Sequence, residues 1–299
     1  MESGCTTQKR KRRQAIYGGL YILPAFLVIT LFCIVTIFMT FYFSMTDYNM
    51  YSPPEFIGLQ NYESIMNSKV FYTALFNTFQ YVIVTVPFQV LLSLTIAAFL
   101  AEKVQNAYGE FLRSAMFIPV IVSAIAASAV WKVIFKNDGI LNSVIQWFGL
   151  HGLNWMGDKQ LAFLCVCIVS IWKNVGYFLV IYYAGIQGVS REQHEAAISD
   201  GASTLQRFWY ITVPSVKPIT YMVITLSIIW SFQIFDVVYQ LTNGGPGTAT
   251  TTLAYVIYQH AFQNQRLGYA SALAVLLLLF VLLIHIIQDL FFKEKKEER

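Results

Sequence analysis

Six long apolar runs, separated by shorter polar segments, dominate the pattern of hydrophobic positions along this chain. They cover residues 15–43, 70–101, 114–130, 161–189, 218–235 and 267–288. Most of them reach the roughly 20 residues that an α-helix needs to cross the hydrocarbon core of a bilayer. The period-two alternation that is typical of membrane β-barrels is absent from these runs. The pattern therefore predicts an all-α integral membrane protein with six transmembrane helices.

The composition supports a membrane protein. Of the 299 residues, 57% are hydrophobic and 12% are charged, and the mean hydropathy is +0.56. A soluble protein would have to bury all six runs in its core, and they are too long and too many for that. We therefore expect a basic tail at residues 1–14, a membrane domain at 15–291 and a charged tail at 292–299.

The distribution of Lys and Arg predicts the orientation of the helices. With six crossings, both tails and the loops at 103–113 and 191–217 lie on one side, which collects fourteen of the twenty basic residues. Because cytoplasmic loops carry an excess of Lys and Arg, both termini are predicted to be cytoplasmic. The basic run at residues 9–13 could also bind nucleic acid, but a membrane span follows it closely, so we expect no nucleic-acid partner.

The chain lacks the motifs of common catalytic and nucleotide-binding sites. It contains no G-x-x-x-x-G-K-[ST], no H-E-x-x-H and no G-x-S-x-G sequence. Cys165 and Cys167 lie two residues apart on a predicted helix, so their side chains point to different faces and cannot share a metal ion. We therefore predict no catalytic residue, no metal site and no cofactor bound by this chain.

Two other classes of membrane protein are alternatives. A self-sufficient secondary carrier usually has acidic residues or broken helices near the middle of the membrane, often in inverted repeats. Asp236 is the only carboxylate deep in a predicted span, and no convincing repeat is visible. A membrane-embedded enzyme would need a catalytic constellation that the chain does not supply. The energy that drives this protein is therefore expected to come from another protein.

A polar insert, defined here as residues 190–214, separates the fourth span from the fifth. Two S-x-x-Q pairs in it have the form of capping boxes and predict two short helices. These pairs are Ser190 with Gln193, and Ser203 with Gln206. Asp200-Gly201 supplies the turn between the helices, because Gly accepts the left-handed conformation, and Pro214 is expected to end the second helix. The insert is therefore predicted to be a cytoplasmic helix-turn-helix.

The second predicted helix of the insert carries a mostly apolar stripe at positions i, i+3, i+4 and i+7. Its members are Leu205, Phe208, Trp209 and Thr212. One interpretation is that the stripe lies on the membrane surface, as amphipathic connecting helices often do. The other is that the helix pair inserts into a groove on a cytoplasmic partner and carries the motion of that partner into the membrane. We favour the second interpretation.

The insert resembles the EAA loop of permease subunits of binding-protein-dependent ABC importers. The matching residues are Glu195-Ala196-Ala197, Asp200-Gly201-Ala202, Phe208, Ile211 and Pro214, with Val213 where Leu is commoner. Further motifs resemble the carbohydrate branch of that family, which includes maltose and glycerol-phosphate permeases. They are F-I-G-L-Q-N-Y at 56–62, Asn77-Thr78, Arg113, Pro119, Trp131, Gly139, Asn142 and L-T-N-G-G-P at 241–246. The resemblance runs from about residue 17 to residue 289.

The resemblance implies a subunit that moves a carbohydrate across the bacterial cytoplasmic membrane. The insert would then dock on an ATPase subunit through the residues that match the motif. These are Glu195, Ala196, Ala197, Asp200, Gly201, Phe208 and Pro214. The implied partners are a second, related permease subunit, two ATP-binding subunits that hold ATP and Mg, and an extracytoplasmic solute-binding protein. A homodimer of this chain is the less common arrangement in this branch.

Two polar stripes on otherwise apolar spans are candidates for lining the substrate pathway. The fourth span carries Ser170, Lys173, Asn174 and Tyr177, and the fifth carries Ser227, Trp230 and Ser231, with Asp236 further round. The spacing i, i+3, i+4 and i+7 places each stripe on one helix face. The family resemblance favours a lining role, since these two spans chiefly line its pathway. The alternative is hydrogen bonding between helices.

Lys173 lies near the middle of its span, where an unpaired ammonium group is costly. It should therefore face water, a carboxylate or an anionic ligand. Pairing with Asp236 or with the partner subunit is one interpretation, and contact with an acidic sugar or a phosphate-bearing solute is the other. The sequence does not decide between them, and it does not identify the carbohydrate.

Overall fold

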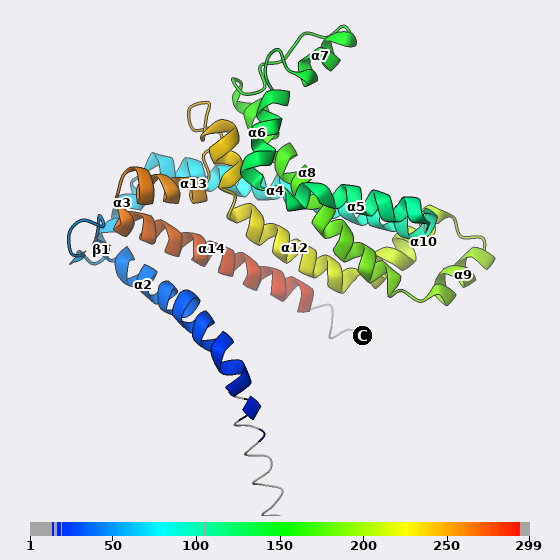
Figure 1. Ribbon diagram of the computed structural model, residues 1–299, viewed down its shortest axis with the longest axis horizontal. Coiled ribbons are helices and arrows are strands. Elements are labelled where there is room, and N and C mark those ends of the chain that lie inside the picture. Colours follow the sequence, from blue (N-terminus) through cyan, green and yellow to red (C-terminus); the bar gives the residue numbers. More distant parts are fainter. Residues whose placement is uncertain (1–13, 15–16, 19, 105, 294–299) are drawn as a thin grey trace, which may run out of the picture. The chain divides into compact units, whose positions relative to one another are not determined.

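The computed structural model describes residues 14, 17–18, 20–104 and 106–293. Most of the two predicted tails, 1–14 and 292–299, lies outside the described residues, as does the basic run at 9–13. The chain divides into two units, Met1–Ile65 with His260–Val275 and Met66–Gln259 with Leu276–Arg299. The described residues are predominantly helical (Figure 1).

The first unit contains an apolar helical segment, Leu20–Ser44, that is long enough to cross a membrane. Its C-terminal part comprises η1 (Thr30–Ile34), a π-helix, and α2 (Val35–Ser44), and the short antiparallel pair β1 (Thr46–Asp47) and β2 (Glu55–Phe56) follows. Asn61, in α3 (Gln60–Met66), donates from Nδ2 to the carbonyl oxygens of Ser44 and Thr46 at 3.0 and 2.9 Å. The F-I-G-L-Q-N-Y motif therefore holds the end of the first span.

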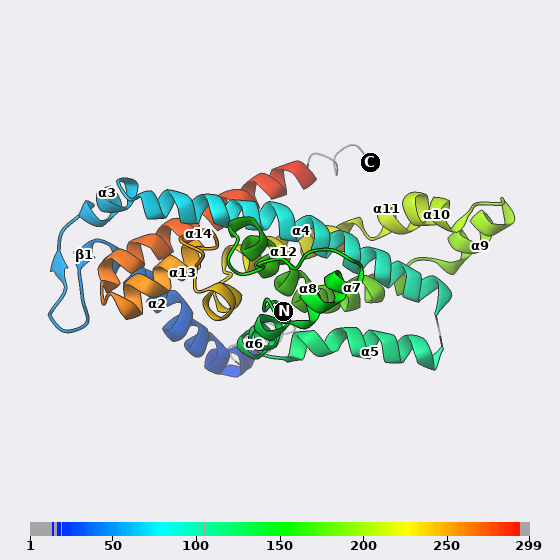
Figure 2. The same cartoon turned by 90° about the horizontal axis from the view of Figure 1, so that it is seen from above.

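The long helices of the second unit lie side by side in both views, whereas the helices at residues 124–134 and 140–147 stand away from them in Figure 1 (Figures 1 and 2). In chain order its elements are α4 (Lys69–Lys103), α5 (Ala107–Ile121), α6 (Ala124–Ile134), α7 (Ile140–Trp147), α8 (Lys159–Gln187), α9 (Arg191–Ser199), α10 (Thr204–Arg207), η2 (Phe208–Thr212), α11 (Val213–Ser215), α12 (Lys217–Phe232), η3 (Val238–Thr242) and α13 (Leu253–Tyr258). Two further elements, η4 (Gln259–Gln263) and α14 (Leu267–Lys293), contribute residues to both units. The helix α4 packs against α8 and α12, and α5 packs against α8.

Four described helices are long and apolar enough to cross a membrane: Leu20–Ser44, Lys69–Glu102, Lys159–Gln187 and Leu267–Phe292. Two bent helix pairs add two more spans if each pair counts as one. The predicted third span, 114–130, is not one straight helix, because α5 and α6 meet at 99°. Val122 is extended there, and the Ser123 hydroxyl accepts from the Ala126 amide and starts a new helix. A span count of six therefore depends on the bent pairs.

Close backbone approach and buried polar contacts hold the second unit together. A Cβ on Gly176 of α8 would lie 1.9 Å from the carbonyl oxygen of Met116, so Gly is required for α5 to pack here. The buried Ser227 hydroxyl of α12 donates to Gln89 of α4, and the hydroxyls of Thr85 and Ser231 lie 3.1 Å apart across the same helix pair. Small residues and hydrogen bonds of this kind are typical of helix interfaces in membranes.

Candidate functional site: the polar insert and a cavity between the spans

The polar insert folds as two helical segments around a glycine turn. Gly201 has a φ of +79°, and its amide donates to the Ile198 carbonyl at 3.0 Å, which closes the end of α9. The Ser203 hydroxyl accepts from the Gln206 amide, and the Gln206 side chain accepts from the Ser203 amide at 2.7 Å. The predicted turn at Asp200-Gly201 and the predicted capping box at Ser203 are both confirmed.

Two details of the predicted insert are wrong. Ser190 forms no side-chain hydrogen bond with the first turn of α9, because residue spacing alone does not determine the rotamers that a capping box needs. Pro214 does not end the second helix. It lies in the first turn of α11, directly after the π-helical η2. Proline has no backbone N–H to donate, and it is tolerated here because the hydrogen-bond pattern changes at this point from that of a π-helix to that of an α-helix. The helix instead turns by 73° after Ser215, where α12 begins.

The side chains of the predicted coupling residues differ in exposure. Glu195, Ala196, Asp200, Gly201 and Pro214 are exposed, and Ala197 and Phe208 are half-buried. The predicted apolar stripe is split, since Leu205 and Trp209 are exposed and Thr212 is buried. The stripe was predicted from α-helical spacing. The i→i+5 hydrogen bonds of the π-helix η2 change the number of residues per turn, so side chains at that spacing no longer lie on one face. Ile198 and Tyr210 add to the exposed apolar side chains of the insert.

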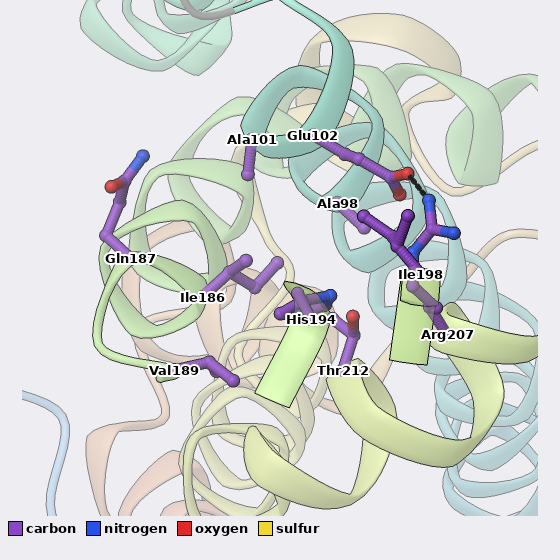
Figure 3. A pocket seen from close by; sticks show the side chains of 10 residues that line it. All are labelled: Ala98, Ala101, Glu102, Ile186, Gln187, Val189, His194, Ile198, Arg207 and Thr212. Carbon is purple, nitrogen blue, oxygen red and sulfur yellow. Dashed lines mark hydrogen bonds and ion pairs between the residues drawn. The ribbon is translucent and has the colours of Figure 1, made fainter. Parts of the chain in front are cut away.

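A partly buried ion pair connects the insert to α4. The guanidinium of Arg207, only 9% exposed, pairs with the carboxylate of Glu102 near the C-terminal end of α4 (Figure 3). The same guanidinium donates to the Ala202 carbonyl at 2.7 Å and to the Thr204 hydroxyl at 3.3 Å. Both residues border a cavity of about 160 Å³ that is also lined by Ala98, Ala101, Ile186, Gln187, Val189, His194, Ile198 and Thr212. The sequence pattern did not single out this pair, because its two residues lie 105 positions apart.

A second cavity, also of about 160 Å³, lies between α8 and α12 and brings most of the predicted pathway residues together. Its lining residues are Tyr81, Ala124, Ser170, Lys173, Asn174, Trp230, Ser231, Gln233, Ile234, Phe235, Asp236 and Val237. Tyr177 does not line the cavity but contacts Trp230, with ring centroids 5.0 Å apart. Ser227 is buried against Gln89 and makes a contact between helices, whereas Trp230 and Ser231 of the same predicted stripe line the cavity.

Lys173 forms hydrogen bonds with backbone carbonyl groups at the break between α5 and α6. Its ammonium group donates to the carbonyl oxygens of Pro119, Val120 and Val122 at 3.4, 3.3 and 2.8 Å. The last carbonyls of a helix lack intrahelical partners, and a cation at this end is favoured by the helix dipole. Among the described residues these carbonyls, and not the Asp236 carboxylate, are the hydrogen-bond partners of Lys173. Neither interpretation of Lys173 from the sequence foresaw this contact, because the break itself was not predicted.

Asn77 of α4 holds the turn that follows η3. Its buried Nδ2 donates to the carbonyl oxygens of Thr248 and Thr251, both at 2.9 Å, and the neighbouring Thr78 hydroxyl accepts from the Leu253 amide. The L-T-N-G-G-P motif enters this turn with Asn243 and Gly244 at positive φ. Asn77-Thr78 and L-T-N-G-G-P, which are far apart in the sequence, therefore form one structural unit.

We expect Asn77→Ala to lower the free energy of unfolding of the membrane domain by about 1–3 kcal/mol, because it removes the side-chain donor to the buried carbonyl of Thr251 and one of two donors to the carbonyl of Thr248. Thermal unfolding of the purified protein in detergent would measure the loss. Gln80→Ala, at an exposed position one turn further along α4, is the matched control and should leave the unfolding temperature unchanged. Equal unfolding temperatures for the two variants would contradict the assigned role.

The fold defines a class of protein: a helical membrane protein with four to six candidate spans and no G-x-x-x-x-G-K-[ST] loop in its sequence. Residues 57–297 match the family described as "Binding-protein-dependent transport system inner membrane component". The chain belongs to this family.

Individual relatives agree with the family match. The chain is 37% identical to a probable ABC transporter permease protein, YurN, of Bacillus subtilis, over 93% of this chain and 97% of the relative. It is 32% identical to the trehalose/maltose transport system permease protein MalF of Thermococcus litoralis, over 93% of each chain. The fold is similar to a chain in the crystal structure of a bacterial ABC transporter involved in import of the acidic polysaccharide alginate, with a TM-score of 0.82 at 19% identity, over 97% of this chain and 98% of that one.

Proposed function

We propose that this chain is the transmembrane subunit of an ABC importer and forms part of the translocation pathway for a carbohydrate. The observation that carries the proposal is the similarity along nearly the whole chain to permease proteins named for trehalose/maltose, arabinooligosaccharide and lactose transport. A pathway for sugars needs hydrogen-bonding groups beside aromatic faces. The cavity between α8 and α12 offers Ser170, Asn174 and Ser231 beside Trp230 and Tyr81.

ATP hydrolysis on separate subunits drives the movement through the polar insert. Glu195 and Gly201 are exposed on it, and the exposed Ile198, Leu205 and Trp209 provide an apolar surface for a cytoplasmic partner. A short rigid helix pair that presents apolar side chains suits a groove on such a partner. The chain itself binds no cofactor, and ATP and Mg are held by the partner ATPases.

The complete transporter contains a second, related permease subunit, two ATP-binding subunits and an extracytoplasmic solute-binding protein. A transporter of similar fold has been crystallised in complex with an alginate pentasaccharide-bound periplasmic protein, which supports a binding-protein partner. The chain lies in the bacterial cytoplasmic membrane, with the tails 1–14 and 292–299 and the polar insert on the cytoplasmic side.

Reconstitution into liposomes with all partner subunits tests the proposal. We expect uptake of a radiolabelled saccharide to require internal ATP, the ATPase subunits and the sugar-loaded binding protein, because the chain has no energy source of its own. Omission of each component in turn provides the controls. Uptake by this chain without ATPase subunits would support a secondary carrier instead, and a binding assay on the cognate solute-binding protein would identify the saccharide.

A further inference from the structure

The helix α4 contacts other parts of the second unit near both of its ends and near its middle. Near its C-terminal end Glu102 pairs with Arg207 of the polar insert, and near its middle Thr85 and Gln89 contact Ser231 and Ser227 of α12. Near its N-terminal end Asn77-Thr78 holds the turn after η3. At 1.5 Å per residue, a helix of this length spans about 50 Å. The middle contact adjoins the cavity between α8 and α12, since Ser231 also lines that cavity.

The Glu102–Arg207 pair is placed to make the insert and α4 move together. Covalent connections join the insert to α8 and α12, whereas α4 is linked to it through side chains. The Arg207 guanidinium binds the Glu102 carboxylate and the carbonyl of Ala202, which directly follows Gly201 in the turn. Figure 3 shows both charged side chains beside the cavity at the base of the insert. Because Arg207 is buried, separation of the pair would leave an uncompensated charge, so the pair resists being pulled apart.

We propose that Glu102 and Arg207 are positioning residues for energy coupling, and that their ion pair transmits movement of the insert to α4 and so to the substrate cavity. This inference rests on the proposed role of the insert as the site where the ATPase acts. It adds a route through α4 to the covalent route through α8 and α12. The EAA-like residues contact the partner, whereas the Glu102–Arg207 pair connects the insert to α4 within this chain.

The test uses the complete reconstituted transporter and measures substrate transported per ATP hydrolysed. We expect Glu102→Gln and Arg207→Gln each to lower this ratio about fivefold or more, within the range of allosteric coupling effects. ATP hydrolysis by the assembled complex should continue. The exchanged pair Glu102→Arg with Arg207→Glu should restore part of the ratio, and Arg207→Lys should retain more of it than Arg207→Gln. Glu110→Gln, at an exposed position in the first turn of α5 and outside the insert, is the matched control.

The outcomes separate this inference from the proposed function. If Glu195→Lys uncouples the transporter while all Glu102 and Arg207 variants keep the normal ratio, the insert drives transport but the ion pair does not carry the movement. If Glu195→Lys also keeps the normal ratio, the proposed role of the insert is wrong. Reduced assembly together with an unchanged ratio in the assembled fraction would assign the pair a purely structural role and overturn the inference. Rescue by the exchanged pair would support it.

Discussion

Gly201→Pro is expected to abolish coupled uptake while the protein still inserts into the membrane. Gly201 has a φ of +79°, whereas proline fixes φ near −65° and lacks the amide that donates to Ile198. The turn would therefore have to rearrange, and the helices on either side of it would lose their mutual orientation. We expect ATP hydrolysis to persist in the complex and ATP-driven saccharide uptake to fall at least about tenfold, a change of about 1.4 kcal/mol. Liposome uptake and ATPase assays measure both quantities.

Gly201→Asn is the matched control for the turn. Asn tolerates the left-handed conformation better than other residues, and no heavy atom lies within 4 Å of a Cβ built at Gly201. This variant should therefore keep most of the uptake. Glu195→Lys tests the same segment by reversing an exposed charge without straining the backbone, and we expect it to uncouple hydrolysis from uptake. Normal uptake by Gly201→Pro would refute a coupling role for the insert.

Lys173→Met is expected to have the second-largest effect. It removes the donor to three carbonyl oxygens at the break between α5 and α6, where the contacts are partly buried; about 1–3 kcal/mol is the cost of one fully buried unsatisfied group. We expect a lower unfolding temperature in detergent and a loss of uptake that is equal for neutral and acidic saccharides. Thermal unfolding and transport assays with both kinds of saccharide, each delivered by its binding protein, measure these effects.

Two controls make the Lys173 experiment specific. Lys173→Arg keeps a cation that can donate to the carbonyls and should recover part of the stability. Lys132→Met removes an exposed lysine whose hydrogen bond goes to a single carbonyl, that of Gln240, and should change stability little. A loss confined to acidic saccharides would instead favour direct contact between Lys173 and an anionic substrate.

Local sequence signals were sufficient for much of the candidate site. The Asp200-Gly201 turn follows from the permissive backbone of glycine, and the capping box at Ser203 follows from residues three positions apart. Helical spacing also placed Ser170 and Asn174 on the face of α8 that lines the cavity. Each of these predictions depends on residues within about two helical turns of one another.

Where the predictions failed, the decisive contacts connect distant segments. The break at Val122 lies within a continuous apolar run, and Lys173 donates to its carbonyls from more than fifty residues away. The π-helix η2 changes the helical spacing between its first and last residues, so that Thr212 is buried while Leu205 and Trp209 of the predicted stripe are exposed. No pattern within the insert shows that Arg207 has a carboxylate partner on α4.

The sequence by itself determined the membrane class, the approximate positions of the four single-helix spans, the polar insert and the resemblance to ABC importer permeases. These conclusions depend on hydrophobic length, charge distribution and short motifs, all of which are local properties of the chain. Only the tertiary structure decided what Lys173, Ser227, Asn77 and Arg207 contact. A buried polar group must find a partner, but which partner lies within reach depends on how the helices pack.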